Sequence, residues 1–134
     1  MRNWLKYAAI GGAFASAATA GVLEETLAVP SGFSVRMQEN RIDQLPDGAQ
    51  VLRMRFVMPA MARPEHVYAE VEGDFEALCN QLASGLVHAQ TDDIDHIVVS
   101  LSDRETDFGV SNPDATQYFE AFTLETDICI WEGF

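Results

Sequence analysis

The sequence has little positive charge and almost no lysine. Its 8 lysines and arginines stand against 21 aspartates and glutamates, which gives a formal net charge of −13 at pH 7. Lys6 is the only lysine, so every later basic residue is an arginine. Such an acidic surface repels phosphate backbones and anionic lipid heads, which argues against nucleic acids and membrane surfaces as partners. The simplest interpretation of the charge is solubility, and cationic partners stay open.

Several features of membrane proteins and large enzymes are also missing. No apolar stretch reaches the ~20 residues that a spanning helix needs. The chain contains neither a G-x-S-x-G nucleophile turn nor a C-x-x-C redox pair. Its 134 residues suffice for one domain with a modest core, which excludes large cofactor-binding folds. The sequence therefore predicts a single domain that uses no cofactor and does not insert stably into a membrane.

The beginning of the chain is typical of an export signal. Two basic residues precede a short, alanine-rich apolar stretch over 8–17, and Ala18 to Ala20 form an A-x-A cleavage pattern. An uncleaved membrane anchor is the alternative, but the stretch is short and contains two glycines. We therefore expect a soluble periplasmic protein. The predicted segments are a Sec-type signal peptide over 1–20, a flexible lead-in over 21–31 and a single domain over 32–134.

The chain has two cysteines, Cys79 and Cys129. An even number of cysteines in an exported protein favours a disulfide. A redox-active pair would show C-x-x-C spacing, and two isolated thiols with scattered histidines do not make a zinc site. We therefore predict a structural disulfide between Cys79 and Cys129, worth about 4 kcal/mol in the chain-entropy model.

Hydrophobic periodicity predicts an α+β domain. Alternation with period two indicates strands, and apolar residues three or four apart from Val67 to Leu86 indicate a helix. The expected fold is one helix on an antiparallel sheet of about five strands, in the order β-β-α-β-β-β, with the disulfide joining helix and sheet. The predicted strands cover 33–38, 52–58, 96–102, 116–124 and 128–134.

The start of the helix has two interpretations. Pro64 suits the first turn of a long helix. Alternatively, Gly73 and Asp74 break the pattern and cap a shorter helix from Phe75, which leaves 67–71 as a strand. We favour one long helix with a weak point at Gly73.

The loop after the third predicted strand holds the densest group of oxygen ligands in the sequence. Counted from Asp103, acids stand at positions one, three, five and twelve, which are ligand positions of an EF-hand calcium loop. However, Phe108 stands where that loop needs glycine, and a strand precedes the loop where an EF-hand has a helix. A solvated loop in which Arg104 pairs with neighbouring acids is the simpler interpretation, and we expect no metal. The polar residues concerned are Asp103, Arg104, Glu105 and Asp107.

His96 is the candidate for acid–base chemistry. It follows Asp95 at the start of the third predicted strand, and a carboxylate that orients a histidine is one ingredient of hydrolysis. Ser100 and Ser102 lie further along this strand, but no strained nucleophile turn accompanies them. A small periplasmic hydrolase that uses His96 and the acids of the loop is therefore the alternative function, and we assign no catalytic residue.

The first predicted hairpin carries a local basic face. Ion pairs with the protein's own acids, such as Glu120 and Glu132, are the preferred interpretation. An anionic ligand or protein that docks on the arginines is the alternative. The hairpin holds four of the six arginines that follow the signal, namely Arg36, Arg41, Arg53 and Arg55.

The last two predicted strands are rich in aromatic residues. Apolar residues on both faces of 116–124 indicate an exposed recognition surface, because a single helix leaves one face of a sheet uncovered. Packing of these residues in the core, with a short edge covered by a loop, is the preferred interpretation, and binding of a partner through them is the alternative. The candidate surface consists of Tyr118, Phe122, Trp131 and Phe134, with Phe119 beside them.

The resemblance to known sequences lies in four segments of the domain. They are Val98-Val99-Ser100-Leu101-Ser102-Asp103-Arg104, Phe108-Gly109, Ala115-Thr116-Gln117-Tyr118-Phe119-Glu120-Ala121 and Cys129 to Phe134. These segments resemble a family of small exported alphaproteobacterial proteins of unknown function, over most of the mature domain. The resemblance includes Leu78-Cys79, which supports the disulfide, and it implies no catalytic residues. The expected function rests on the sheet face and the last strands, and is the binding of an unidentified periplasmic protein or envelope component.

Overall fold

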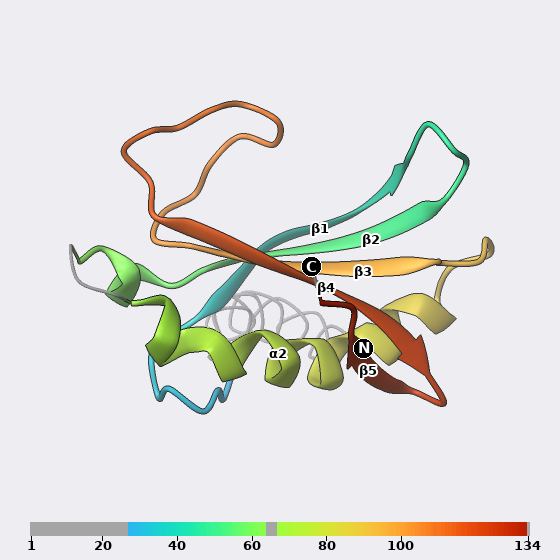
Figure 1. The fold of residues 1–134 in the computed structure, drawn as a ribbon, viewed down its shortest axis with the longest axis horizontal. Coiled ribbons are helices and arrows are strands. Elements are labelled where there is room, and N and C mark those ends of the chain that lie inside the picture. Colours follow the sequence, from blue (N-terminus) through green and yellow to red (C-terminus); the bar gives the residue numbers. More distant parts are fainter. Residues whose placement is uncertain (1–26, 64–66, 134) are drawn as a thin grey trace, which may run out of the picture.

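One helix and five strands make up the part of the chain that the computed structural model describes, residues 27–63 and 67–133 (Figure 1). The predicted α+β fold and its order β-β-α-β-β-β are confirmed. The predicted signal peptide, most of the lead-in, Pro64 and Phe134 lie outside the described residues. The elements are β1 (Arg36–Gln44), β2 (Gln50–Val57), the short 3-10 helix η1 (Pro59–Met61), α2 (Tyr68–His88), β3 (His96–Ser102), β4 (Gln117–Glu125) and β5 (Ile128–Trp131).

The five strands are neighbours in chain order, β1-β2-β3-β4-β5. Three of the four pairs are antiparallel, but β2 and β3 run parallel. The helix α2 connects these two strands, and a crossover helix returns the chain to the end of the sheet from which β2 started. The sheet is therefore mixed, which corrects the antiparallel sheet predicted from the sequence.

The core lies between α2 and one face of the sheet (Figure 1). Alternate residues of each strand point to this face, and helix residues three or four apart meet them. No helix of the described residues lies on the opposite face, and the loop between β3 and β4 arches over one end of it (Figure 1). We call this side of the sheet the uncovered face. Core residues include Leu52, Met54 and Phe56 of β2, Ile97, Val99 and Leu101 of β3, and Val71, Phe75 and Leu78 of α2.

The helix α2 begins at Tyr68 and continues through Gly73 without a break. The single long helix is therefore confirmed, and the shorter helix from Phe75 with a strand before it is wrong. Asp74 is fully buried within the helix and does not cap it. Neither α2 nor any other helix among the described residues has the length and apolarity that a membrane span requires.

The segment 27–35 packs along α2. The backbone N–H and the hydroxyl of Ser31 both donate to the carboxylate of Asp74, at 2.9 and 2.5 Å. Further along the helix, the side-chain amide of Gln81 donates to the Ala28 carbonyl at 2.7 Å. The described end of the predicted flexible lead-in is thus packed structure, because it supplies the donors that a buried carboxylate requires.

A disulfide between Cys79 of α2 and Cys129 of β5 confirms the predicted pairing. Both cysteines are buried, and their Cα atoms lie 6.2 Å apart. Beside the disulfide, the backbone N–H of Cys129 donates to the side-chain oxygen of Asn80 at 2.8 Å. The helix therefore holds the short edge strand β5 by a covalent bond and a hydrogen bond.

A β-bulge changes the alternation within β1. The register against β2 shifts between Met37 and Glu39. Even-numbered and odd-numbered residues therefore exchange faces of the sheet at the bulge. The predicted strand 33–38 ended too early for this reason, because the alternation on which it rested stops at the bulge. Beyond the bulge, three charged residues of β1 lie on the uncovered face. Glu39 is opposite Arg55, Arg41 is opposite Arg53, and Asp43 is opposite Val51.

Candidate functional site

A cleft on the uncovered face, beneath the loop between β3 and β4, is the candidate functional site. Its volume is about 320 Å³. Arg53, Arg55 and Ser100 line it from the sheet, because strand alternation points these side chains away from α2. Val110 of the loop and Phe119 of β4 add apolar walls. Asp107 of the loop adds a carboxylate, so the cleft combines charged groups of both signs with apolar groups.

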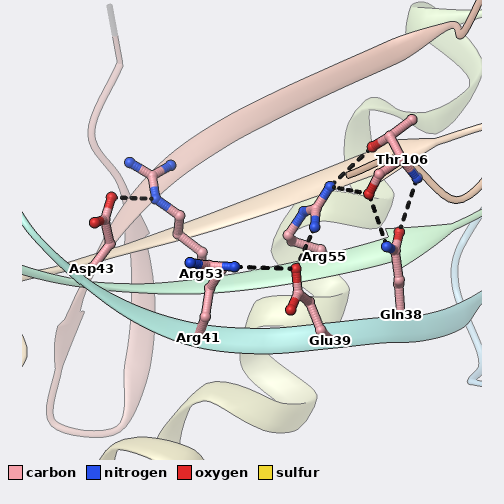
Figure 2. A network of polar contacts seen from close by, with 7 residues as sticks. All are labelled: Gln38, Glu39, Arg41, Asp43, Arg53, Arg55 and Thr106. Carbon is pink, nitrogen blue, oxygen red and sulfur yellow. Dashed lines mark hydrogen bonds and ion pairs between the residues drawn. The ribbon is translucent and has the colours of Figure 1, made fainter. Parts of the chain in front are cut away.

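Arg55 fastens the loop to the sheet (Figure 2). Its guanidinium pairs with Glu39 of β1 and donates two hydrogen bonds to Thr106, to the carbonyl at 2.8 Å and to the hydroxyl at 2.9 Å. The side-chain amide of Gln38 donates to the same carbonyl at 2.9 Å. Because Arg55 is only 6% exposed, these charge-assisted bonds form largely away from water, where they are strongest.

Two further arginines of the hairpin pair with acids of β1 (Figure 2). The Nε of Arg53 donates to Asp43 at 3.1 Å, and a terminal nitrogen of Arg41 lies 3.6 Å from Glu39. The ring of Phe108 lies against their guanidinium groups, with its centroid 3.9 Å from the Arg41 carbon and 5.5 Å from the Arg53 carbon. Ion pairing of the hairpin arginines is confirmed, but their partners are acids of β1 and, for Arg36, Glu105 of the loop, and not the glutamates of the last strands that had been expected.

Two acids of the loop, Asp103 and Glu105, pair with different arginines. Arg104 donates to both carboxylate oxygens of Asp103, at 3.0 and 3.2 Å, and this hydrogen bonding raises the pKa of Arg104 above its ordinary value. Glu105 pairs instead with Arg36, at 2.8 Å. Within the described residues, no three His, Cys, Asp or Glu side chains are grouped so that they could hold a metal ion. Arg104 therefore pairs with a neighbouring acid, as the simpler interpretation predicted. The described acids of the loop do not converge as the ligands of a calcium site would.

His96 pairs with Glu132 and lies far from the serine and the loop acids of the predicted hydrolytic site. Its Nδ1 lies 2.7 Å from the Glu132 carboxylate, whereas Asp95 accepts a hydrogen bond from a backbone N–H of β2 at 2.8 Å. Ser100 lies roughly 13 Å further along β3, and Asp103 roughly 23 Å away beyond its end, at about 3.3 Å per residue. The expected orientation of His96 by Asp95 is therefore wrong, and the structure does not bring the parts of the hydrolytic site together.

The predicted aromatic surface is divided between the two sides of the sheet. Phe122 is 2% exposed and belongs to the core, because it shares with Tyr118 the face of β4 that α2 covers. Its assignment to an exposed surface is therefore wrong. Trp131 is 58% exposed but lies on the α2 side, opposite Phe122 in the neighbouring strand. Phe119 points to the uncovered face and is 64% exposed.

The contribution of the loop to this cleft was missed in the sequence. Phe108 lies on the arginines, and Val110, which is 62% exposed, lines the cleft. The available signal was the segment Phe108-Gly109-Val110, which places two large apolar residues in an otherwise polar loop.

The fold and the cleft define a small α+β protein, with one helix on a mixed sheet and a cleft on the uncovered face. The chain belongs to a family of unknown function, DUF6497, whose model matches residues 9–134. The resemblance to an uncharacterised family is confirmed to this extent. Comparisons with curated proteins and with solved structures found no match.

Proposed function

We propose that this protein acts in the periplasm, after export, as a binding module that docks a protein partner on its uncovered face and needs no cofactor. The observation that carries this function is the exposure of two apolar side chains at the cleft, Phe119 at 64% and Val110 at 62%. Both line the cleft of about 320 Å³ together with Arg53. Exposed aromatic and arginine side chains around one pocket are the groups that dominate binding energy at protein interfaces.

The cleft suits a segment that combines an apolar side chain with a carboxylate. Arg53 uses its Nε for Asp43, and its two terminal nitrogens have no hydrogen-bond partner among the described residues. These nitrogens match the two oxygens of a carboxylate, and Phe119 matches an apolar neighbour. Because the chain as a whole is strongly acidic, an acidic segment is repelled elsewhere and directed to these arginines.

The cysteine chemistry supports a periplasmic location. Disulfides form and persist in oxidising compartments, and the buried Cys79–Cys129 bond joins helix and sheet. The export signal predicted over 1–20 leads to the same compartment.

The test is affinity capture of the tagged, disulfide-intact protein from periplasm under mild crosslinking, followed by mass spectrometry. Phe119→Ala and Arg53→Gln each remove one candidate contact. Ile128→Ala is the matched control, since it removes a side chain that is 57% exposed on the same face, roughly 20 Å along the sheet at about 3.3 Å per residue. We expect the wild type and the control to retain one partner, and the two cleft variants to bind it about tenfold more weakly or worse.

Equal retention of the partner by Phe119→Ala and the wild type would refute this function. Specific retention of a lipid or glycan in place of a protein would also refute it, because it would identify a different class of envelope component as the occupant. Titration of the purified partner against the same variants gives the affinities that decide between these outcomes.

A further inference from the structure

A second cavity lies on the α2 side of the sheet, where the first turns of the helix face β4 and the end of β5. Its volume is about 420 Å³, within the range that small ligands occupy. Three aromatic side chains, Tyr68, Phe122 and Trp131, line it together with three carboxylates, those of Glu72, Glu76 and Glu120. We call this cavity the aromatic pocket.

Glu120 holds the side chains of Tyr68 and Trp131 in place. Its two carboxylate oxygens accept one hydrogen bond each, from the hydroxyl of Tyr68 and, at 2.8 Å, from the indole N–H of Trp131. The backbone of Gly133 lies against the other part of the indole, where an added Cβ would meet the ring at 3.4 Å. The two rings are therefore oriented before a ligand arrives, which reduces the entropy cost of binding.

The charge of the pocket is negative. Glu72 and Glu76 stand one turn apart on α2, a spacing at which like charges destabilise a helix, and no ion pair among the described residues neutralises them. The charge of Glu72 also acts on Tyr68. The hydrogen bond to Glu120, together with burial and the charges of Glu120 and Glu72, raises the pKa of Tyr68 to about 12.

We propose that the aromatic pocket binds a small organic cation with an ammonium head. The faces of tryptophan and tyrosine attract such a cation, and carboxylates around the rings supply the opposite charge. A metal ion would instead need converging oxygen or nitrogen ligands, and the described residues provide no group of three. The site lies on the opposite side of β4 from the cleft, so it does not depend on the function proposed for the uncovered face.

Trp131 itself reports on the pocket. Trp4 is the only other tryptophan, so a full-length chain that carries Trp4→Phe has a single indole, located at the site. Choline chloride is titrated into this protein at constant ionic strength, in parallel with 3,3-dimethylbutan-1-ol, which has nearly the same shape and no charge. We expect a saturable change in fluorescence with choline and none with the alcohol.

Two variants of the same chain complete the test. Glu72→Gln/Glu76→Gln keeps the size of both side chains and removes their charge, and should raise the Kd for choline about tenfold. Ile128→Ala, which alters an exposed side chain on the other face, should leave this Kd unchanged. Equal responses to choline and the neutral alcohol would overturn the inference, as would a choline Kd that is the same with and without the two glutamates.

Discussion

Removal of the Cys79–Cys129 disulfide should lower the free energy of unfolding by about 4 kcal/mol. The bond joins residues with a sequence separation of 50. In the chain-entropy model, the freedom that a loop of this length regains in the unfolded state corresponds to about 4 kcal/mol at 25 °C. Domains of this size are stable by only about 5–15 kcal/mol, so the variant should lose a large part of its stability.

The loss should be greatest at β5. This strand has four residues, lies at the edge of the sheet and pairs only with β4. The disulfide and the bond from Cys129 to Asn80 tie the strand itself to α2, and Ser84 and His88 of α2 contact Asp127 in the turn just before it, both at 2.9 Å. Amide exchange in β5 should therefore become fast in the variant, whereas β2 and β3 in the centre of the sheet should exchange only through global unfolding.

Guanidinium chloride unfolding of oxidised wild type and Cys79→Ala/Cys129→Ala measures the difference in free energy. Alanine is the appropriate replacement because both sites are buried and a serine hydroxyl would add an unsatisfied polar group. Reduced wild-type protein is the control, since it loses the crosslink but keeps both sulfur atoms. A loss below about 1 kcal/mol would refute the loop-entropy reasoning, and two titratable thiols in the unreduced protein would refute the disulfide itself.

Two further predictions concern side chains at the two sites. Arg55→Ala removes the bonds that hold Thr106, so it should lower the free energy of unfolding by about 2 kcal/mol and accelerate amide exchange in the loop; unchanged exchange there would contradict the clamp. Nuclear magnetic resonance of labelled tyrosine rings, which resolves Tyr68 from the other two tyrosines, should show Tyr68 titrating at about 12 in the wild type and nearer its ordinary pKa of 10.0 in Glu120→Gln. A raised pKa means that protonated Tyr68 stabilises the folded state. This stabilisation is complete below pH 10.0 and is lost as the pH rises toward about 12. The melting temperature should therefore fall over that range, and it should fall less in Glu120→Gln. A wild-type Tyr68 that titrates at 10.0 would contradict its hydrogen bond to Glu120.

The helix and strands could be predicted because their signals are local. The third strand has its predicted bounds, 96–102, since β-branched residues fill its middle and an acidic turn precedes it. The helix showed its apolar spacing on both sides of Gly73, which made one continuous element the better prediction. Local patterns do not identify neighbouring strands, however. The parallel pairing of β2 and β3 follows only from the crossover through α2, which acts between segments far apart in the chain.

The hairpin between β4 and β5 shows how one residue decides which face a side chain takes. Thr126 and Asp127 form a two-residue turn in which both have positive φ, 53° and 67°. This turn sets Phe122 opposite Trp131, on the same side as Cys129 and therefore toward α2. Turns of this geometry usually contain glycine or asparagine, and this turn contains neither. Phe122 was misplaced because the prediction grouped aromatic residues from both faces of 116–124, whereas strand alternation puts Phe122 on the covered face and Phe119 on the uncovered face.

The cleft could not be predicted from local signals, because distant segments build it. Arg55 and Thr106 are 51 residues apart, and their contact depends on how the loop folds back. The acidic composition predicted that the arginines would form ion pairs with acids of the same chain, and the hairpin arginines do so. Which acids they find depends on the bulge after Met37, which turns Glu39 toward the arginines of β2.

The two candidate sites meet in β4, where consecutive side chains point to opposite faces. Phe119 lines the cleft on one side, and Glu120 holds the aromatic pocket on the other. The thickness of the sheet keeps the carboxylates of the pocket away from Arg53, so an acidic chain can keep a cationic cleft and an anionic pocket without mutual neutralisation. Phe119 lies on the uncovered face, and Glu72 and Glu76 lie on α2 on the other side of the sheet, so loss of partner binding in Phe119→Ala and loss of choline binding in Glu72→Gln/Glu76→Gln are independent results.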